Sequence, residues 1–391
     1  MTVKPAKRTE AVQEYYFSKK LAQIDKMKRD GADIINLGIG SPDQMPSENT
    51  INALVNEAGK PGSHGYQSYN GILPLRKAFS EWYKKYFNTI LDPDGEILPL
   101  MGSKEGIMHI SMAFIDPGDE VLVPDPGYPT YTSVTNLVGG KVRTYDLNEK
   151  TGWLPDLDGL EKSDLSRVKL MWINYPHMPT GTKGSIQLYE KLINFAKKNS
   201  ILLCNDNPYS FILNKTYLSI LQVEGAKDIA LELNSLSKSQ NMAGWRIGMV
   251  AGSREHIREI LKVKSNMDSG MFLGLQSAAV EALSAPETWY DTVNEVYKRR
   301  RIIVEEIMEL LNCSYDRNQS GLFLWGRIPD NIASCEEFVE NFLQKAHVFI
   351  TPGFIFGKNG ERYIRISLCA SEGKLEEAKT RLGRYPVTGS R

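Results

Sequence analysis

LNSLSKSQNMAGWRIG, residues 233–248, is the stretch of sequence that decides the fold and the chemistry. An apolar strand pattern ends in Ser235, Ser237 and Lys238, and Arg246 follows eight residues after the lysine. A single lysine after a strand is ordinarily a solvated surface residue. Here two small hydroxyls and an arginine accompany it, and together they suit a phosphate dianion while the amine forms an imine (Schiff base) with an aldehyde on the same ligand. The cofactor that carries both groups is pyridoxal 5′-phosphate (PLP).

The sequence around this stretch alternates short apolar runs with helix-length segments. This rhythm predicts an α/β fold with a mainly parallel mixed sheet flanked by helices. The runs are EVLVPDPG (120–127), KVRTYDL (141–147), VKLMWINYP (168–176), ILLCNDNPY (201–209), IALELNSLS (229–237) and RIGMVAGS (246–253). Ligands bind such sheets at the carboxyl ends of the strands, so we expect the functional residues to follow these runs.

Length and patterning predict two closely associated domains. The 391 residues, 41% of them hydrophobic, are enough to bury a large core. An amphipathic pattern from Glu287 to Asn312 predicts a long connecting helix, and its run Arg299–Arg301 is interpreted as a solvated face. FLWGRIP, HVFITPGFIFG and YIRISL predict a smaller α+β unit. We expect a large PLP-binding domain over residues 48–295 and a small domain formed by residues 1–47 and 296–391.

Charge and composition favour small-molecule chemistry. Lys and Arg number 47, as do Asp and Glu, so no global field favours nucleic acid or a membrane surface. The N-terminal segment lacks the apolar run of a signal peptide, and no later run reaches membrane-spanning length, so we expect a cytoplasmic protein. Four cysteines without CxxC spacing and five dispersed histidines without an HExxH pair predict no metal site.

Two residues near the end of the ILLCND run suit the edge of a PLP ring. A carbanion on a PLP-bound substrate is stabilised only while the pyridine nitrogen stays protonated, which calls for a carboxylate at that edge. Asp206 is the candidate, and the alternative is a cap in the turn Asp206-Asn207-Pro208. Tyr209 is placed to donate to the phenolate oxygen of the ring, and the alternative is core packing.

Three further positions complete the candidate site. Gly102 and Ser103 stand where a strand gives way to a helix, and a helix N-terminus offers backbone N–H groups to a phosphate, although an ordinary helix start would look the same. Tyr128, in PDPGYPTY, suits stacking on the ring face or a plain turn. Arg365 lies in the middle of the apolar run YIRISL and therefore needs an anion, either a structural carboxylate or the α-carboxylate of a substrate.

These residues match a family. The chain resembles fold type I, class I/II PLP-dependent aminotransferases over nearly its whole length, and is most similar to their LL-diaminopimelate aminotransferase-like and aspartate aminotransferase-like branch. The motifs that carry the resemblance are NLGIGSPD, YQSYNGILPLR, PLMGSKEGIMH, PGDEVLVPDPGYPTY, NYPHMPTG and SLSKSQNMAGWRIG.

The resemblance implies a role for each matching position. Lys238 would carry the Schiff base and then act as the general base, Asp206 would hold the pyridinium, and Tyr209 would contact the phenolate oxygen. Tyr66 would reach the phosphate of a partner subunit, which implies a homodimer with shared active sites. The other implied cofactor-binding positions are Gly102, Ser103, Lys104, Tyr128, Met178, Ser235, Ser237 and Arg246, and the substrate-facing positions are Tyr15, Gly40 and Arg365.

One position departs from the family pattern. The family motif Asn-Pro-Thr-Gly is here Met178-Pro179-Thr180-Gly181, and methionine cannot donate the hydrogen bond that asparagine gives the phenolate oxygen. We therefore expect the imine to hold its proton to higher pH. His177 and Asn174 are the alternative donors nearby.

The sequence favours an aminotransferase that moves an amino group between an L-amino acid and a 2-oxo acid. The resemblance implies 2-oxoglutarate as one partner and LL-diaminopimelate or aspartate as candidate donors. The alternatives are a PLP-dependent β-lyase or decarboxylase on the same fold, and a non-catalytic PLP-binding protein. The group that would bind a distal carboxylate is left open among Lys104, Arg299 and residues 266–270 of a partner chain.

Overall fold

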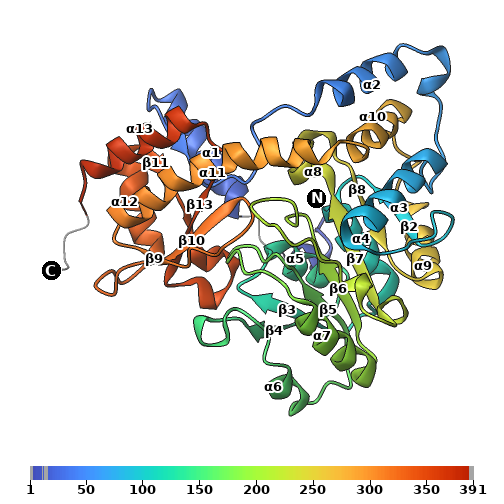
Figure 1. Ribbon diagram of the computed structural model, residues 1–391. Coiled ribbons are helices and arrows are strands. Elements are labelled where there is room, and N and C mark those ends of the chain that lie inside the picture. The colour runs from blue at the N-terminus through green and yellow to red at the C-terminus, as the bar shows by residue number, and fades with distance from the viewer. Residues whose placement is uncertain (1–2, 11, 13–15, 387–391) are drawn as a thin grey trace.

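A seven-stranded mixed sheet forms the larger part of the molecule in the computed structural model (Figure 1), which describes residues 3–10, 12 and 16–386. Every strand runs parallel to its neighbours except β8, which is antiparallel to both β2 and β7. In spatial order the strands are β2 (Ile97–Leu100), β8 (Gly248–Ala251), β7 (Ala230–Ser235), β6 (Leu202–Asp206), β5 (Val168–Ile173), β3 (Glu120–Asp125) and β4 (Lys141–Asp146). The six apolar runs named above contain β3 to β8, and the predicted α/β fold is confirmed. β2 is the strand expected before the helix start at Gly102 and Ser103.

Helices bury both faces of this sheet. On β5, Leu170 and Trp172 point into one apolar cluster while Met171 and Ile173 point into the other, as expected for a sheet covered on both sides. One face is covered by α4 (Ser103–Phe114), α5 (Pro129–Leu137) and α9 (Arg254–Lys264). The other is covered by α3 (Leu73–Phe87), α7 (Ile186–Asn199) and α10 (Leu273–Leu283). The remaining helices of this part are α2 (Glu48–Ala58), α6 (Leu157–Glu161) and α8 (Leu236–Ser239).

Both ends of the described chain contribute to a second, smaller unit. Its antiparallel sheet has the order β12 (Thr351–Pro352), β13 (Tyr363–Ser367), β10 (Phe323–Arg327) and β9 (Ser314–Tyr315). A parallel pair joins β1 (Ile35–Asn36) to β11 (Val348–Phe349). The helices here are α1 (Tyr16–Arg29), α12 (Cys335–Ala346) and α13 (Glu372–Gly383). Short 3₁₀ turns occur at Lys7–Thr9, Pro61–His64, Glu149–Thr151, Ile220–Gln222, Ala226–Asp228, Ala243–Trp245, Gly353–Phe356 and Lys358–Gly360.

The long helix α11 (Glu287–Leu310) connects the two sheets (Figure 1), as its amphipathic pattern predicts. Tyr290 packs into the core beside the seven-stranded sheet, whereas the stretch from Val293 to Met308 packs into the core of the smaller unit. The prediction that the arginines of this helix, Arg299–Arg301, form a solvated face is wrong for Arg300. That side chain is 5% exposed, because it forms two bonds, of 2.6 and 2.8 Å, to the Asp43 carboxylate.

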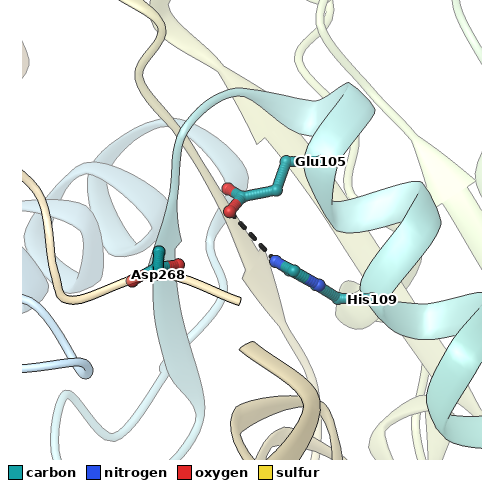
Figure 2. A group of neighbouring side chains, drawn as sticks. All are labelled: Glu105, His109 and Asp268. Carbon is teal, nitrogen blue, oxygen red and sulfur yellow. Dashed lines mark hydrogen bonds and ion pairs between the residues drawn. The ribbon is translucent and has the colours of Figure 1, made fainter. Parts of the chain in front are cut away.

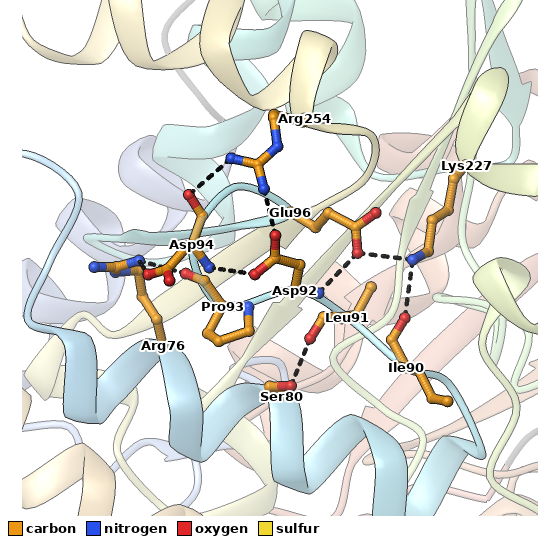
Figure 3. A network of polar contacts seen from close by, with 10 residues as sticks. All are labelled: Arg76, Ser80, Ile90, Leu91, Asp92, Pro93, Asp94, Glu96, Lys227 and Arg254. Carbon is orange, nitrogen blue, oxygen red and sulfur yellow. Dashed lines mark hydrogen bonds and ion pairs between the residues drawn. The ribbon is translucent and has the colours of Figure 1, made fainter.

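Ion pairs fix the loop that leads into the edge strand β2 (Figure 3). Asp94 pairs with Arg76 of α3 at 3.0 Å, and Glu96 pairs with Lys227 at 2.7 Å. Asp92 pairs with Arg254 at the start of α9. This loop therefore ties α3 and α9, which cover opposite faces of the sheet, to one edge. Among the helices in the described ranges, none combines the length and the apolar character needed to cross a membrane.

Candidate active site

A cavity of about 360 Å³ lies between the two sheets. The carboxyl ends of β6 and β7 and the start of α4 form one side, and β10 and β13 face them. Most of the residues predicted from the sequence line this cavity: Gly40, Ser103, Lys104, Tyr128, Met178, Asp206, Tyr209, Ser235, Ser237, Lys238, Arg246 and Arg365.

Lys238 projects from α8, the single helical turn that follows β7. Ser235 begins this turn and accepts a bond from the backbone N–H of Ser237 at 3.1 Å. The Lys238 Nζ donates to the carbonyl of Gly40 at 2.5 Å. Burial lowers the pKa of Lys238, and the positive charges of Arg365 and Arg246 lower it further, whereas the nearby Cys369 and Asp206 raise it. The net shift favours the neutral amine, which is the nucleophilic form.

Asp206 ends β6 with one carboxylate oxygen satisfied and the other facing no protein donor. Oδ2 accepts from the Tyr131 hydroxyl at 3.0 Å, while the buried Oδ1 has no hydrogen-bond partner among the described residues. Burial raises the Asp206 pKa to about 7, although the Tyr131 bond and the charge of Lys238 oppose the rise. A pyridine N–H is a donor that fits Oδ1. Because Oδ1 of Asp206 lacks a donor and the ring nitrogen of PLP could supply one, the site fits PLP.

The start of α4 and Arg246 form a cationic cradle beside Lys238. Gly102 has φ +90° and packs against the Arg246 guanidinium so closely that a Cβ would fall 2.3 Å from Nη2. Ser103 begins α4, and the hydroxyls of Ser235 and Ser237 lie 2.9 Å apart. A helix N-terminus combined with a guanidinium is suited to a phosphate dianion.

A polar cluster of Glu105, His109 and Asp268 lies at the first turns of α4, the helix whose start forms this cradle (Figure 2). The Glu105 carboxylate accepts from the backbone N–H of Met101 at 2.5 Å and lies 3.0 Å from Nε2 of His109. The neighbouring Asp268 pairs with the buried Lys264 at 2.8 Å. The Lys264 ammonium already neutralises Asp268, so the cluster gives little reason to add a metal ion. The expectation of no metal stays a prediction.

Arg365 extends from β13 and lines the cavity. It is 4% exposed, and its Nη2 donates to the Gly38 carbonyl at 2.7 Å while Nη1 lies 3.2 Å from the Met178 Sδ. Its Cζ lies 3.8 Å from the centroid of Phe323, 4.7 Å from that of Phe356 and 5.7 Å from that of Phe17. The stacked rings hold the guanidinium plane in place.

Two tyrosines bring hydroxyl groups to the cavity. Tyr128 precedes α5 and meets Tyr131 edge-on at 5.6 Å, and Tyr209 meets Phe323 edge-on at 6.0 Å. Burial raises the pKa of both Tyr128 and Tyr209 above the usual tyrosine value. Both phenols therefore stay protonated and able to donate near neutral pH.

The sequence did not identify Tyr131 and three phenylalanines that line the cavity: Phe17, Phe323 and Phe356. Tyr131 had a signal, since it lies one helical turn after Tyr128 in the same motif. Its ring stacks on Trp172 at 5.0 Å, which fixes the hydroxyl toward Asp206. Phe323 and Phe356 lie in the runs FLWGRIP and HVFITPGFIFG, which predict the smaller unit but do not assign either ring to the site, and Phe17 had no signal.

Three predicted residues are not among those lining the cavity. Gly102 lies beside it, behind Arg246. The Tyr66 side chain is 93% exposed on the single chain, and Tyr15 lies outside the described residues. Of the alternative donors, His177 is turned to Thr180 at 2.8 Å. Asn174 lines the cavity but bonds the backbone carbonyl of Asp206 and accepts from the Met178 N–H at 2.7 Å.

A half-buried lysine after a strand, a carboxylate with an orphaned oxygen and an anion cradle on this α/β fold define a fold type I PLP-dependent enzyme. The aminotransferase class I and II family matches residues 32–382. LL-diaminopimelate aminotransferases from Halothermothrix orenii and Aquifex aeolicus are 41% and 40% identical to the chain, each covering 92% of it and 94% and 95% of their own length. The solved structure of apo-BacF from Bacillus subtilis is 32% identical, covers all of both chains and has a TM-score of 0.95. The chain belongs to the class I and II aminotransferases and is a PLP-dependent enzyme that acts on amino acids and 2-oxo acids.

Proposed function

We propose that the chain transfers the amino group of LL-diaminopimelate to 2-oxoglutarate, with Lys238, Asp206 and Arg365 at the centre of the site. The observation that carries the proposal is the meeting in one cavity of the lysine amine, the carboxylate with an orphaned oxygen and the buried guanidinium. The choice of donor is supported by relatives named LL-diaminopimelate aminotransferases, which align along nearly their whole length.

When bound, PLP supplies an aldehyde that condenses with amines and a pyridinium ring that accepts electrons from the bonds at the substrate Cα. Lys238 attaches the cofactor and afterwards moves a proton from the substrate Cα, a task that its lowered pKa favours. Asp206 keeps the pyridine nitrogen protonated through Oδ1, and Tyr131 orients its carboxylate. Tyr209 would donate to the phenolate oxygen and Tyr128 would cover the ring face, since both line the cavity. Met178 fills the position beside them without donating a hydrogen bond.

The phosphate binds at the start of α4. Gly102, Ser103 and Lys104 offer the helix N-terminus, and Arg246 offers its guanidinium with the hydroxyls of Ser235 and Ser237. Support comes from the cavity, which Ser103 and Arg246 both line, and from the packing of Gly102 on Arg246, which leaves no room for a Cβ. The substrate α-carboxylate binds Arg365, with the backbone of Gly40 alongside. Arg299 is not a candidate for a distal carboxylate, since it pairs with Glu372 at 2.9 Å and is not a lining residue.

The active enzyme is a homodimer in which Tyr66 completes the phosphate site of the partner subunit. Its exposed ring is accompanied by other exposed apolar side chains, Met101, Met267 and Phe272. Phe272 stacks on His64 at 5.8 Å, close to Tyr66 in the chain. Large exposed apolar side chains such as these are typical of a surface that a second subunit covers.

We further propose the domain division 48–295 against 1–47 and 296–391, which the packing of α11 across two cores supports. A cytoplasmic location is supported by the four cysteines, all buried and free. The absence of nucleic-acid and membrane partners stays a prediction.

A panel of amino donors tests the substrate. The holoenzyme is assayed with 2-oxoglutarate and LL-diaminopimelate, aspartate, an aromatic and an aliphatic amino acid, and the kcat/KM values are compared. We expect LL-diaminopimelate to give the highest value. An equal or higher value for any other donor would overturn the substrate while leaving the residue roles intact. Each donor alone, without an oxo acid, should convert the cofactor to its amine form once per site without releasing pyruvate or ammonia.

A further inference from the structure

A carboxylate at the end of β3 binds the turn that precedes β13 in the smaller sheet. Asp125 is 8% exposed, and its Oδ1 accepts from the backbone N–H of Asn359 at 2.9 Å. Its Oδ2 accepts from the backbone N–H of Lys358 at 3.1 Å. The two oxygens thus satisfy two consecutive N–H groups at the start of the 3₁₀ turn Lys358–Gly360, more than 230 residues away in the chain.

Two more hydrogen bonds join the same two segments, and a third ties the turn to the end of β4. The Asn359 side-chain amide donates to the Asp125 carbonyl at 3.0 Å and to the Asp146 carboxylate at 2.8 Å. The backbone N–H of Gly127 donates to the Phe356 carbonyl at 2.7 Å. Gly357 has φ +138°, and a Cβ there would fall 2.2 Å from Oδ1 of Asp125. Only glycine allows so close an approach.

Each half of this junction is close in the chain to a ring that lines the active-site cavity. Tyr128 follows Asp125 by three residues, and Phe356 precedes Lys358 by two. Tyr128 belongs to the side that would cover the cofactor, while Phe356 packs 4.7 Å from the Arg365 guanidinium. The bonds of Asp125 therefore fix the spacing between the ring-covering side of the cavity and its carboxylate-binding side.

We propose that Asp125 is a positioning residue for transamination, which holds Phe356, and through it the Arg365 guanidinium, in register with Tyr128. The inference rests on the proposed roles of Arg365 and Tyr128. Asp125 touches neither substrate nor cofactor, so its effect passes through Phe356. A displacement of about 1 Å in a substrate-positioning group is enough to lower a rate about 100-fold.

The test compares Asp125→Ala with Asp156→Ala in the holoenzyme. Asp156 also caps backbone N–H groups, at α6 on the surface away from the cavity, through a 2.9 Å bond to Gly159. We expect Asp125→Ala to lower kcat/KM for the amino donor about 10- to 100-fold, mainly through KM, with cofactor content unchanged. Asn359→Ala keeps its backbone donor to Asp125 and should give a smaller loss in the same direction. Asp156→Ala should leave KM as in the wild type.

A double-mutant cycle with Phe356→Ala separates positioning from general loss of stability. If Asp125 acts through Phe356, Asp125→Ala should change KM by less than twofold once the ring is gone. Full additivity, or equal effects of Asp125→Ala and Asp156→Ala, would overturn the proposal. If Asp125→Ala fails to fold, Asn359→Ala takes its place in the same cycle. Arg365→Lys is measured alongside: an unchanged KM there would overturn the role of Arg365 in carboxylate binding, which is a different failure.

Discussion

The Nη1 of Arg365 lies 3.2 Å from the Sδ of Met178, so a thioether contacts the guanidinium that we propose binds the substrate carboxylate. Met178 is 6% exposed, and its backbone N–H is held by Asn174, whose amide in turn bonds the Asp206 carbonyl. The Met178 side chain thus lies between the Arg365 guanidinium and the end of β6, which carries Asp206. The family motif that this stretch resembles has an asparagine at this position, whose side-chain amide would donate a hydrogen bond where methionine cannot.

Met178→Asn should lower the midpoint at which the visible absorption band of the holoenzyme titrates. A donor restored to the phenolate oxygen withdraws electron density and stabilises the deprotonated form, so the proton is lost at lower pH. One such hydrogen bond corresponds to a shift of about one pH unit. Met178→Leu is the matched control, because it keeps the volume and adds no donor. If the asparagine and leucine variants titrate together, Met178 has no part in the environment of the cofactor.

Tyr131→Phe should move the acid limb of the kcat/KM profile to higher pH. Burial raises the Asp206 pKa to about 7, and the Tyr131 hydroxyl opposes the rise. Without that bond the pKa of Asp206 increases, so its ionised form is lost at a higher pH as the solution is acidified. The expected displacement is about 0.5 to 1 pH unit. Tyr189→Phe also deletes a buried hydroxyl, bonded at 3.3 Å to the Tyr175 carbonyl, and should not move the limb. An unshifted limb in Tyr131→Phe would show that this hydroxyl does not tune Asp206.

Gly102→Ala should weaken PLP binding about tenfold or more. The residue has φ +90°, which costs an L side chain about 1–2 kcal/mol, and its Cβ would collide with the Arg246 guanidinium. The affinity is measured by adding PLP to resolved apoenzyme. Gly373→Ala is the control, because Gly373 does not have a positive φ and a Cβ there would meet open space. Equal affinities for the two variants would place the phosphate elsewhere.

The sequence predicts those site residues that the ends of adjacent strands bring together. It does not predict the burial and the partners of residues that depend on packing between distant segments. Lys238 and Asp206 follow adjacent parallel strands, so their proximity follows from topology. Arg365 is recognisable because a guanidinium within an apolar strand must be buried. In the sequence Arg300 looks like part of a solvated run. Its burial is explained by its pairing with Asp43, which lies 257 residues earlier in the chain. The partners of Asp125 lie equally far away, and no periodicity links two segments across such a separation.

Two inactive variants should restore activity to each other if Tyr66 serves the partner subunit. Lys238→Ala removes the amine of its own site but still supplies Tyr66 to the partner, while Tyr66→Ala keeps its lysine and lacks only the donated tyrosine. A hybrid dimer then contains one site with Lys238 and Tyr66 both present and one site with neither. With random exchange of subunits about a quarter of all sites are native, so the mixture should recover about a quarter of the wild-type activity per chain.

The control mixes Lys238→Ala with Asp206→Ala: both changes fall in the chain's own site, so every site in the hybrid is damaged and no activity should return. Recovery no greater than the mean of the separate homodimers, or full activity in Tyr66→Ala alone, would mean that the exposed ring of Tyr66 takes no part in catalysis.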